Sequence, residues 1–168
     1  YEIMPSLVGS EMCIRDSVIA GKAAAFKEAL DPSFAEYSQQ VIANAQAMTK
    51  VFNQAPEARL ISGATDNHLL LIEVTGFGLN GKEAEAILDS VNITVNKNSI
   101  PFEQLSPFKT SGIRIGTPAI TSRGFKEEDA VEVAKLIVQV LKDPENTAVH
   151  DEVKAAVAAL TKKYPLYN

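Results

Sequence analysis

One arginine in this 168-residue chain has the surroundings of an anion-binding residue. Arg114 alternates with Ile113 and Ile115, and this pattern predicts a short strand whose isoleucines face a core while the guanidinium faces the opposite side. Gly112 and Gly116 on either hand leave room for a ligand to come close. The spacing alone nevertheless favours a solvated arginine on an open sheet face over an anion site.

The segment before this arginine strengthens the case for a site. Residues 93–95 are β-branched and predict a strand, and the residues between them and Gly112 have neither a helical nor a strand period. A loop of this length is uncommon inside a compact domain unless it binds something. We therefore expect the candidate site to lie within residues 92–119.

A second motif, TDNH at residues 65–68, has a chemical and a structural interpretation. Asp66 and His68 could act as an acid–base pair. Aspartate and asparagine also form turns by hydrogen bonding to nearby backbone, and this is the favoured interpretation. No role is assigned to His68 or to the second histidine, His150.

A third motif, at residues 76–81, has the G-x-G-x-x-G spacing of a dinucleotide-binding turn. The acidic residue that should hold the ribose about twenty residues later is missing, and no series of βαβ units follows. We interpret the stretch as a glycine-rich turn in which Asn80 caps a helix and Glu83 completes a capping box.

The bulk composition excludes several classes of protein. The net charge is −5, and no basic cluster is longer than Lys162–Lys163. The sequence therefore indicates no basic surface that would bind nucleic acid or an anionic membrane. With one cysteine, Cys13, and two histidines, neither an internal disulfide nor a zinc site is expected. No signal peptide or membrane span is recognised, so we expect a cytoplasmic protein with small-molecule partners.

The periodicity of the rest of the chain predicts an α+β fold, with a small sheet covered on one face by helices. Asp31 and Pro32 end one helix and begin the next, because aspartate caps helices and proline suits the first helical position. Residues 69–74 are nearly all apolar and predict a strand buried on both faces. A further strand is expected at residues 59–62, and helices at residues 18–30, 32–53 and 126–142. Two more helices are expected from their apolar faces, one formed by Ala84, Ile87, Leu88 and Val91 and the last by Val149, Val153, Ala156, Val157 and Leu160.

Several motifs in a fixed order resemble the C-terminal part of bacterial serine hydroxymethyltransferases. They are VIAGKAAAFKEAL at 18–30, TDNHLLL at 65–71, TVNKNSIP at 94–101, SPF at 106–108, TSGIRIGTPAITSRGF at 110–125 and YPLY at 164–167. The resemblance implies the small C-terminal α+β domain of a fold-type I pyridoxal-phosphate enzyme, with a short, mostly antiparallel sheet covered by helices. Residues 18–54 would link it to a large domain, and residues 55–168 would form the small domain. Residues 1–17 do not match the motifs and are expected to be a foreign or disordered leader, or a divergent natural tail.

The resemblance also implies roles for individual residues. Arg114 matches the arginine that holds the α-carboxylate of serine or glycine. Asn98 matches an asparagine that hydrogen bonds to the folate pteridine, and Ser106, Pro107 and Phe108 match the segment that contacts tetrahydrofolate.

The family's reaction sets the functional expectation. The resemblance implies a cytoplasmic, homodimeric transferase of one-carbon metabolism and glycine biosynthesis, which interconverts serine plus tetrahydrofolate with glycine plus 5,10-methylenetetrahydrofolate using pyridoxal phosphate. The family's Schiff-base lysine and other catalytic residues match no position here. We therefore expect no catalytic, cofactor-binding or metal-binding residue in this chain, and a C-terminal fragment that is inactive alone. The alternatives are a non-catalytic module that binds a carboxylate or pterin, and a scaffold domain without a ligand.

Overall fold

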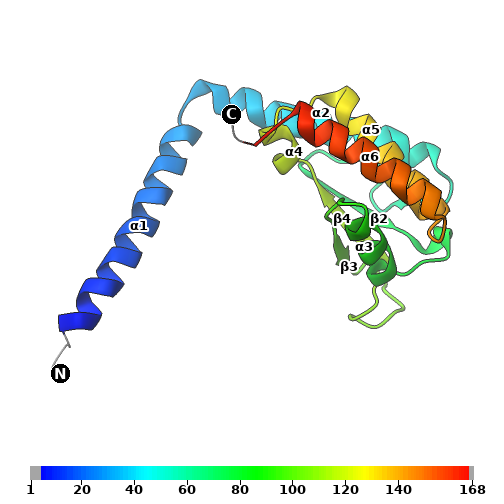
Figure 1. Ribbon diagram of the computed structural model, residues 1–168, viewed down its shortest axis with the longest axis horizontal. Helices are drawn as coiled ribbons and strands as arrows, with labels where there is room; N and C mark the ends of the chain where they lie inside the picture. The colour runs from blue at the N-terminus through cyan, green and yellow to red at the C-terminus, as the bar shows by residue number, and fades with distance from the viewer. Residues whose placement is uncertain (1–4, 167–168) are drawn as a thin grey trace. The chain divides into compact units, whose positions relative to one another are not determined.

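The computed structural model describes residues 5–166, with side chains from residue 16 onward. The chain divides into two compact units, Tyr1–Ser38 and Gln39–Asn168 (Figure 1). The helix that links them, α2 (Pro32–Gln54), begins in the first unit and continues into the second.

The first unit consists of α1 (Pro5–Ala29) and the start of α2. Asp31 Oδ1 accepts a hydrogen bond from Ser33 N at 2.9 Å, which confirms the predicted cap. Helix α1 begins thirteen residues before the predicted start at residue 18 and so includes most of the proposed leader. No proline follows Pro5 within α1, so nothing there prevents a helix, although the segment lacks the apolar period that would have predicted one.

The second unit is built on a four-stranded antiparallel sheet in the order β1-β2-β4-β3, which confirms the α+β prediction. The strands are β1 (Arg59–Leu60), β2 (Leu69–Glu73), β3 (Asn96–Asn98) and β4 (Gly112–Gly116). In this register Arg114 lies opposite Leu71 on one side and Asn96 on the other.

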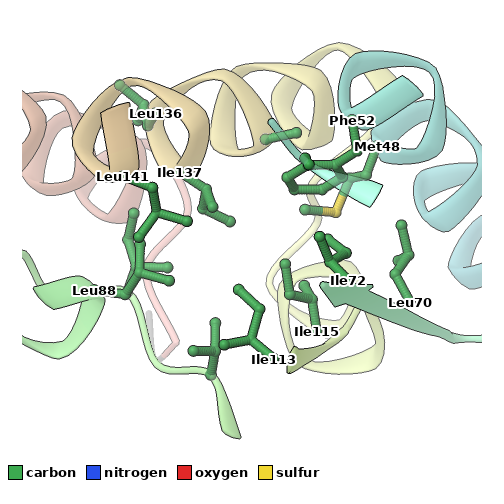
Figure 2. Packing of buried hydrophobic residues seen from close by; sticks show 14 of the residues in the cluster. Met48, Phe52, Leu70, Ile72, Leu88, Ile113, Ile115, Leu136, Ile137 and Leu141 are labelled. Atoms are coloured by element: carbon green, nitrogen blue, oxygen red, sulfur yellow. The ribbon is translucent and has the colours of Figure 1, made fainter. Parts of the chain in front are cut away.

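Helices and strands share one apolar core, in which side chains of α2, α3 and α5 pack against β2 and β4 (Figure 2). Besides α2, the helices of the second unit are α3 (Gly81–Ser90), the short α4 (Pro118–Ser122), α5 (Glu127–Lys142) and α6 (Thr147–Lys163). A 3₁₀ turn, η1 (Thr75–Phe77), comes just before α3. The labelled core residues are Met48, Phe52, Leu70, Ile72, Leu88, Ile113, Ile115, Leu136, Ile137 and Leu141.

The opposite face of the sheet differs from the prediction. Leu70 and Ile72 are buried, but Leu69, Leu71 and Glu73 are only half-buried, so β2 is not buried on both faces. The apolar sequence predicted that both faces of β2 would be covered. The second unit covers the face of Leu70 and Ile72 and leaves the face of Leu69, Leu71 and Glu73 partly exposed. This face carries Arg114.

The third strand also differs. Residues 93–95 were predicted to form it, but β3 is Asn96–Asn98. Ile93 and Val95 are instead nearly buried in the core cluster, at 9% and 7% exposed. Their β-branched side chains therefore reflect burial rather than strand pairing.

The glycine-rich stretch forms the predicted capping box. Asn80 Oδ1 accepts from Glu83 N at 3.0 Å, and Glu83 Oε2 accepts from Asn80 N at 2.9 Å. Gly78 has φ +76°, a left-handed conformation that glycine adopts without strain. The turn and the start of α3 are therefore explained without a nucleotide.

Candidate functional site

Strand β4 presents Arg114 away from the core. Ile113 is fully buried and Ile115 is 7% exposed, while Arg114 between them is exposed. Because side chains alternate along a strand, burial of the two isoleucines fixes the guanidinium on the open face. The sequence prediction for this strand is confirmed.

Arg114 differs from the other arginines whose side chains are described. Arg59 is ion-paired with Glu73. Arg123 donates to the main-chain oxygens of Tyr164 at 3.0 Å and Thr161 at 3.1 Å. Within residues 16–166, the Arg114 guanidinium has neither a hydrogen-bond acceptor nor an ion-pair partner. All five of its N–H donors are therefore available to a ligand.

An open cavity of about 680 Å³ lies beside this guanidinium. Asn98 of β3 lines the same cavity, so the structure brings two of the predicted site residues together. Leu71, directly opposite Arg114, supplies part of an apolar wall. The remaining lining comes from the segment between β1 and β2 and from the start of β2: Ser62, Ala64, Thr65, Asp66, Asn67, Leu69 and Leu70.

The TDNH segment at the cavity edge is a turn. Asn67 Oδ1 accepts from Leu69 N at 2.8 Å, and Thr65 Oγ1 donates to Leu69 O at 2.7 Å. These bonds confirm the structural interpretation of the motif. Asp66 Oδ1 accepts from Asn67 Nδ2 at 3.3 Å, and the described contacts include no hydrogen bond between Asp66 and His68.

The other predicted residues, Ser106, Pro107 and Phe108, lie in the β3–β4 loop and do not line the cavity. Ser106 O accepts from Lys109 N at 2.9 Å and from Thr110 N at 3.0 Å, which closes a turn. Phe108 is 80% exposed. The structure thus brings Asn98 and Arg114 together and leaves the S-P-F turn apart, and the ligand roles of all five residues stay predictions.

Sequence reasoning missed Glu103, which organises this loop. Its Oε1 accepts from Leu105 N at 2.9 Å and from Ser111 Oγ at 2.5 Å, and its Oε2 accepts from Ile100 N at 3.3 Å and Ser111 N at 2.8 Å. Burial acts to raise the pKa of Glu103, but these hydrogen bonds outweigh it and lower the pKa to about 2. Three of its four donors are main-chain groups, so no side-chain pattern could have indicated this role.

The cavity suits a carboxylate better than a covalently bound cofactor. The expected cofactor, pyridoxal phosphate, needs a lysine amine, and no lysine lines the cavity. Lys97, Lys142 and Lys163 are ion-paired with Glu85, Glu57 and Asp129 respectively. The residues present therefore do not fit that cofactor.

Residues 5–166 contain no helix with the length and apolarity needed to cross a bilayer. Among residues 16–166, whose side chains are described, no three histidine, cysteine, aspartate or glutamate side chains gather as a metal site would require.

Two comparisons with known proteins match this chain to the same family. A family model described as "Serine hydroxymethyltransferase" matches residues 2–137. The curated serine hydroxymethyltransferase of Lactobacillus acidophilus is 53% identical over 164 residues, which is 98% of this chain and 39% of the relative. The chain thus spans well under half the length of that relative. The family match runs through the residues that were set apart as a leader, and the proposed domain boundaries stay predictions.

Proposed function

This chain belongs to the serine hydroxymethyltransferase family, and we propose that it supplies the carboxylate-binding arginine of a site that interconverts serine and glycine. The observation that carries the proposal is the unpaired Arg114 guanidinium beside a cavity that also includes Asn98. A buried isoleucine on each side holds the strand in place, so the arginine projects from a rigid support.

The chemistry of the guanidinium suits an α-carboxylate. Its planar fork donates two parallel hydrogen bonds to the two oxygens of a carboxylate, which fixes the orientation as well as the position of the ligand. A carboxylate held in this way has a defined direction for the bonds at its α-carbon. Control of that direction is what a serine–glycine interconversion requires, because one particular bond must break.

Asn98 is the proposed partner of the folate pteridine. Its Nδ2 already donates to Ser99 O at 2.7 Å. That bond fixes the orientation of the amide and leaves its oxygen available to accept a hydrogen bond from a ring edge. On the same proposal, the exposed ring of Phe108, together with Ser106 and Pro107, contacts tetrahydrofolate.

The rest of the reaction is assigned to the part of the family protein that this chain does not span. That part would hold pyridoxal phosphate through its Schiff-base lysine, and the chain alone would neither bind the cofactor covalently nor turn over serine. The homodimeric state, the cytoplasmic location and the place in one-carbon metabolism and glycine biosynthesis belong to the complete enzyme on this proposal.

A complex tests the proposal directly. The chain is co-expressed with the remaining, N-terminal part of the Lactobacillus acidophilus relative, and glycine is titrated while the absorbance of pyridoxal phosphate is followed. We expect a spectral shift that saturates with glycine. An unchanged spectrum in a soluble, cofactor-loaded complex would contradict the proposal.

The same titration isolates the arginine. Arg114→Lys loses the bidentate geometry, so glycine binding should weaken by roughly 1.5–3 kcal/mol, or about 10–150-fold in Kd. Arg59→Lys is the matched control, because that guanidinium is already ion-paired with Glu73. Wild-type affinity in Arg114→Lys would remove this residue from the site.

One observation also favours a second candidate function, a carboxylate- or pterin-binding module. Every residue that lines the cavity belongs to the second unit. Calorimetric titration of the chain alone with glycine and with a reduced folate tests this function. Saturable binding without the remainder would favour the module, and binding only in the complex would favour the enzyme. A scaffold domain predicts that changes at Asn98 and Arg114 affect no ligand in either experiment.

A further inference from the structure

The carboxylate of Glu103 joins the two ends of the loop between β3 and β4. Its Oε2 accepts from Ile100 N at 3.3 Å, near the start of the loop, and from Ser111 N at 2.8 Å, at its end. Its Oε1 accepts from Ser111 Oγ at 2.5 Å and from Leu105 N at 2.9 Å. One side chain therefore holds three separate points of the loop together.

Those points border the residues of the candidate site. Ile100 comes two residues after Asn98, and Ser111 directly precedes Gly112, the residue opposite Asn98 in the sheet. A Cβ on Gly112 would lie 2.8 Å from the Ile100 side chain and 3.0 Å from Asn98 O. The two ends of the loop are thus in tight contact at the position where Asn98 enters the cavity.

The carboxylate has no capacity left for a ligand. A carboxylate accepts about four hydrogen bonds, two at each oxygen. Glu103 receives four from within the loop. Its role must therefore be exercised through the residues that it holds, and not by contact with a substrate.

The same loop exposes large apolar side chains. Phe102 is 94% exposed and Phe108 is 80% exposed, while Leu105 between them is 37% exposed. An unanchored loop would tend to cover such side chains, since burial of an aromatic ring is favourable. Hydrogen bonds to an ionised acceptor such as the half-buried Glu103 carboxylate are among the stronger contacts that can oppose such a collapse.

We propose that Glu103 is a positioning residue, which keeps the β3–β4 loop closed so that Asn98 and the S-P-F turn are arranged for a pterin-containing ligand before that ligand binds. The inference rests on the proposed function for the identity of the ligand. It assigns Glu103 no contact with glycine, because Arg114 is held by β4 and not by the loop.

Three variants test the inference. Glu103→Gln removes the charge and replaces one acceptor oxygen with a donor. Ser111→Ala removes a single hydrogen bond to Glu103 and serves as the milder variant if Glu103→Gln does not fold. Glu145→Gln changes an exposed acid outside the loop and serves as the matched control. Amide hydrogen exchange of the full chain is measured at Ile100 and Leu105, and the affinities for 5-formyltetrahydrofolate and glycine are measured in the co-expressed complex.

The expected result is a loss of affinity for the folate but not for glycine. Exchange at Ile100 and Leu105 should accelerate about tenfold or more in Glu103→Gln and less in Ser111→Ala, and folate affinity should fall about tenfold in Glu103→Gln. Glycine affinity should stay at the wild-type value in both variants. A general loss of structure would weaken the binding of both ligands equally. A selective loss of folate affinity would therefore identify Glu103 as a positioning residue.

The outcomes separate the two proposals. Unchanged loop exchange and folate affinity in both variants would overturn the role of Glu103 and leave the function of Arg114 intact. Loss of glycine and folate binding in equal measure would also overturn it, in favour of a purely structural role. If the wild-type complex binds neither ligand, the proposed function fails, and the exchange measurement on the chain alone still decides whether Glu103 closes the loop.

Discussion

Gly81, the first residue of α3, lies against the end of the β3–β4 loop in a contact that leaves no room for a side chain. A Cβ at this position would lie 2.2 Å from Thr110 Oγ1 and 2.4 Å from Gly112 O. The second atom belongs to the main chain and cannot rotate away. Gly81 N also donates to Thr110 O at 2.9 Å, so the two segments are held together. We predict that Gly81→Ala forces α3 away from β4 and destabilises the second unit.

The magnitude follows from two opposing effects. Overpacking of a tight contact typically costs about 1–3 kcal/mol, and overlap with the main chain places this case near the upper end. Alanine in place of glycine recovers about 1 kcal/mol in a helix interior through better propensity, which is an upper bound at the first residue of α3. The net expected loss is about 2 kcal/mol in the free energy of unfolding.

Urea unfolding of the full chain, followed by far-UV circular dichroism, measures this loss. Gly78→Ala is the matched control within the same motif, because a Cβ there meets no atom within 4 Å. Its left-handed φ of +76° should cost only about 1 kcal/mol. Adding Thr110→Ala to Gly81→Ala removes one of the two overlaps, so it should restore part of the lost stability and not all of it.

A Gly81→Ala protein within about 0.5 kcal/mol of the wild type would refute this close approach.

Two more predictions concern buried polar contacts. Asn44 is fully buried and its Nδ2 donates to Phe125 O at 3.0 Å; Asn44→Ala leaves that carbonyl unpaired and should cost about 1–3 kcal/mol in urea unfolding. Burial acts to raise the pKa of Asp129, but hydrogen bonds from Lys126 N and Tyr164 Oη outweigh it and lower the pKa below its ordinary value. A lowered folded-state pKa stabilises the protein above the unfolded-state pKa, near 4, and this contribution is lost as the pH falls below it. The stability difference between wild type and Asp129→Asn should therefore shrink between pH 7 and about pH 3, and a constant difference in thermal unfolding would contradict this linkage.

The sequence predicted the features that depend on local pattern. Alternation in Ile113-Arg114-Ile115 was sufficient to place the guanidinium on the open face, because a strand has only two faces. The capping box at Asn80 was equally predictable, since its two hydrogen bonds join residues three apart.

Features that depend on tertiary contacts were mispredicted or missed. Ile93 and Val95 carry strand-forming side chains, yet burial in the core takes them out of β3, which consists of polar residues. Helix α4 has only five residues, too few to show a helical period. Glu103 was missed because its acceptor role depends on main-chain N–H groups that every sequence contains.

The lack of a protein partner for Arg114 restricts the residues that its neighbours can be. Positions 71 and 96 lie directly across the sheet from it and carry a leucine and an asparagine, neither of them ionisable. An aspartate or glutamate at either position would provide a tethered carboxylate at a local concentration that no dissolved amino acid could match. Neutrality at these two neighbours is thus a condition for the arginine to respond to a ligand at all.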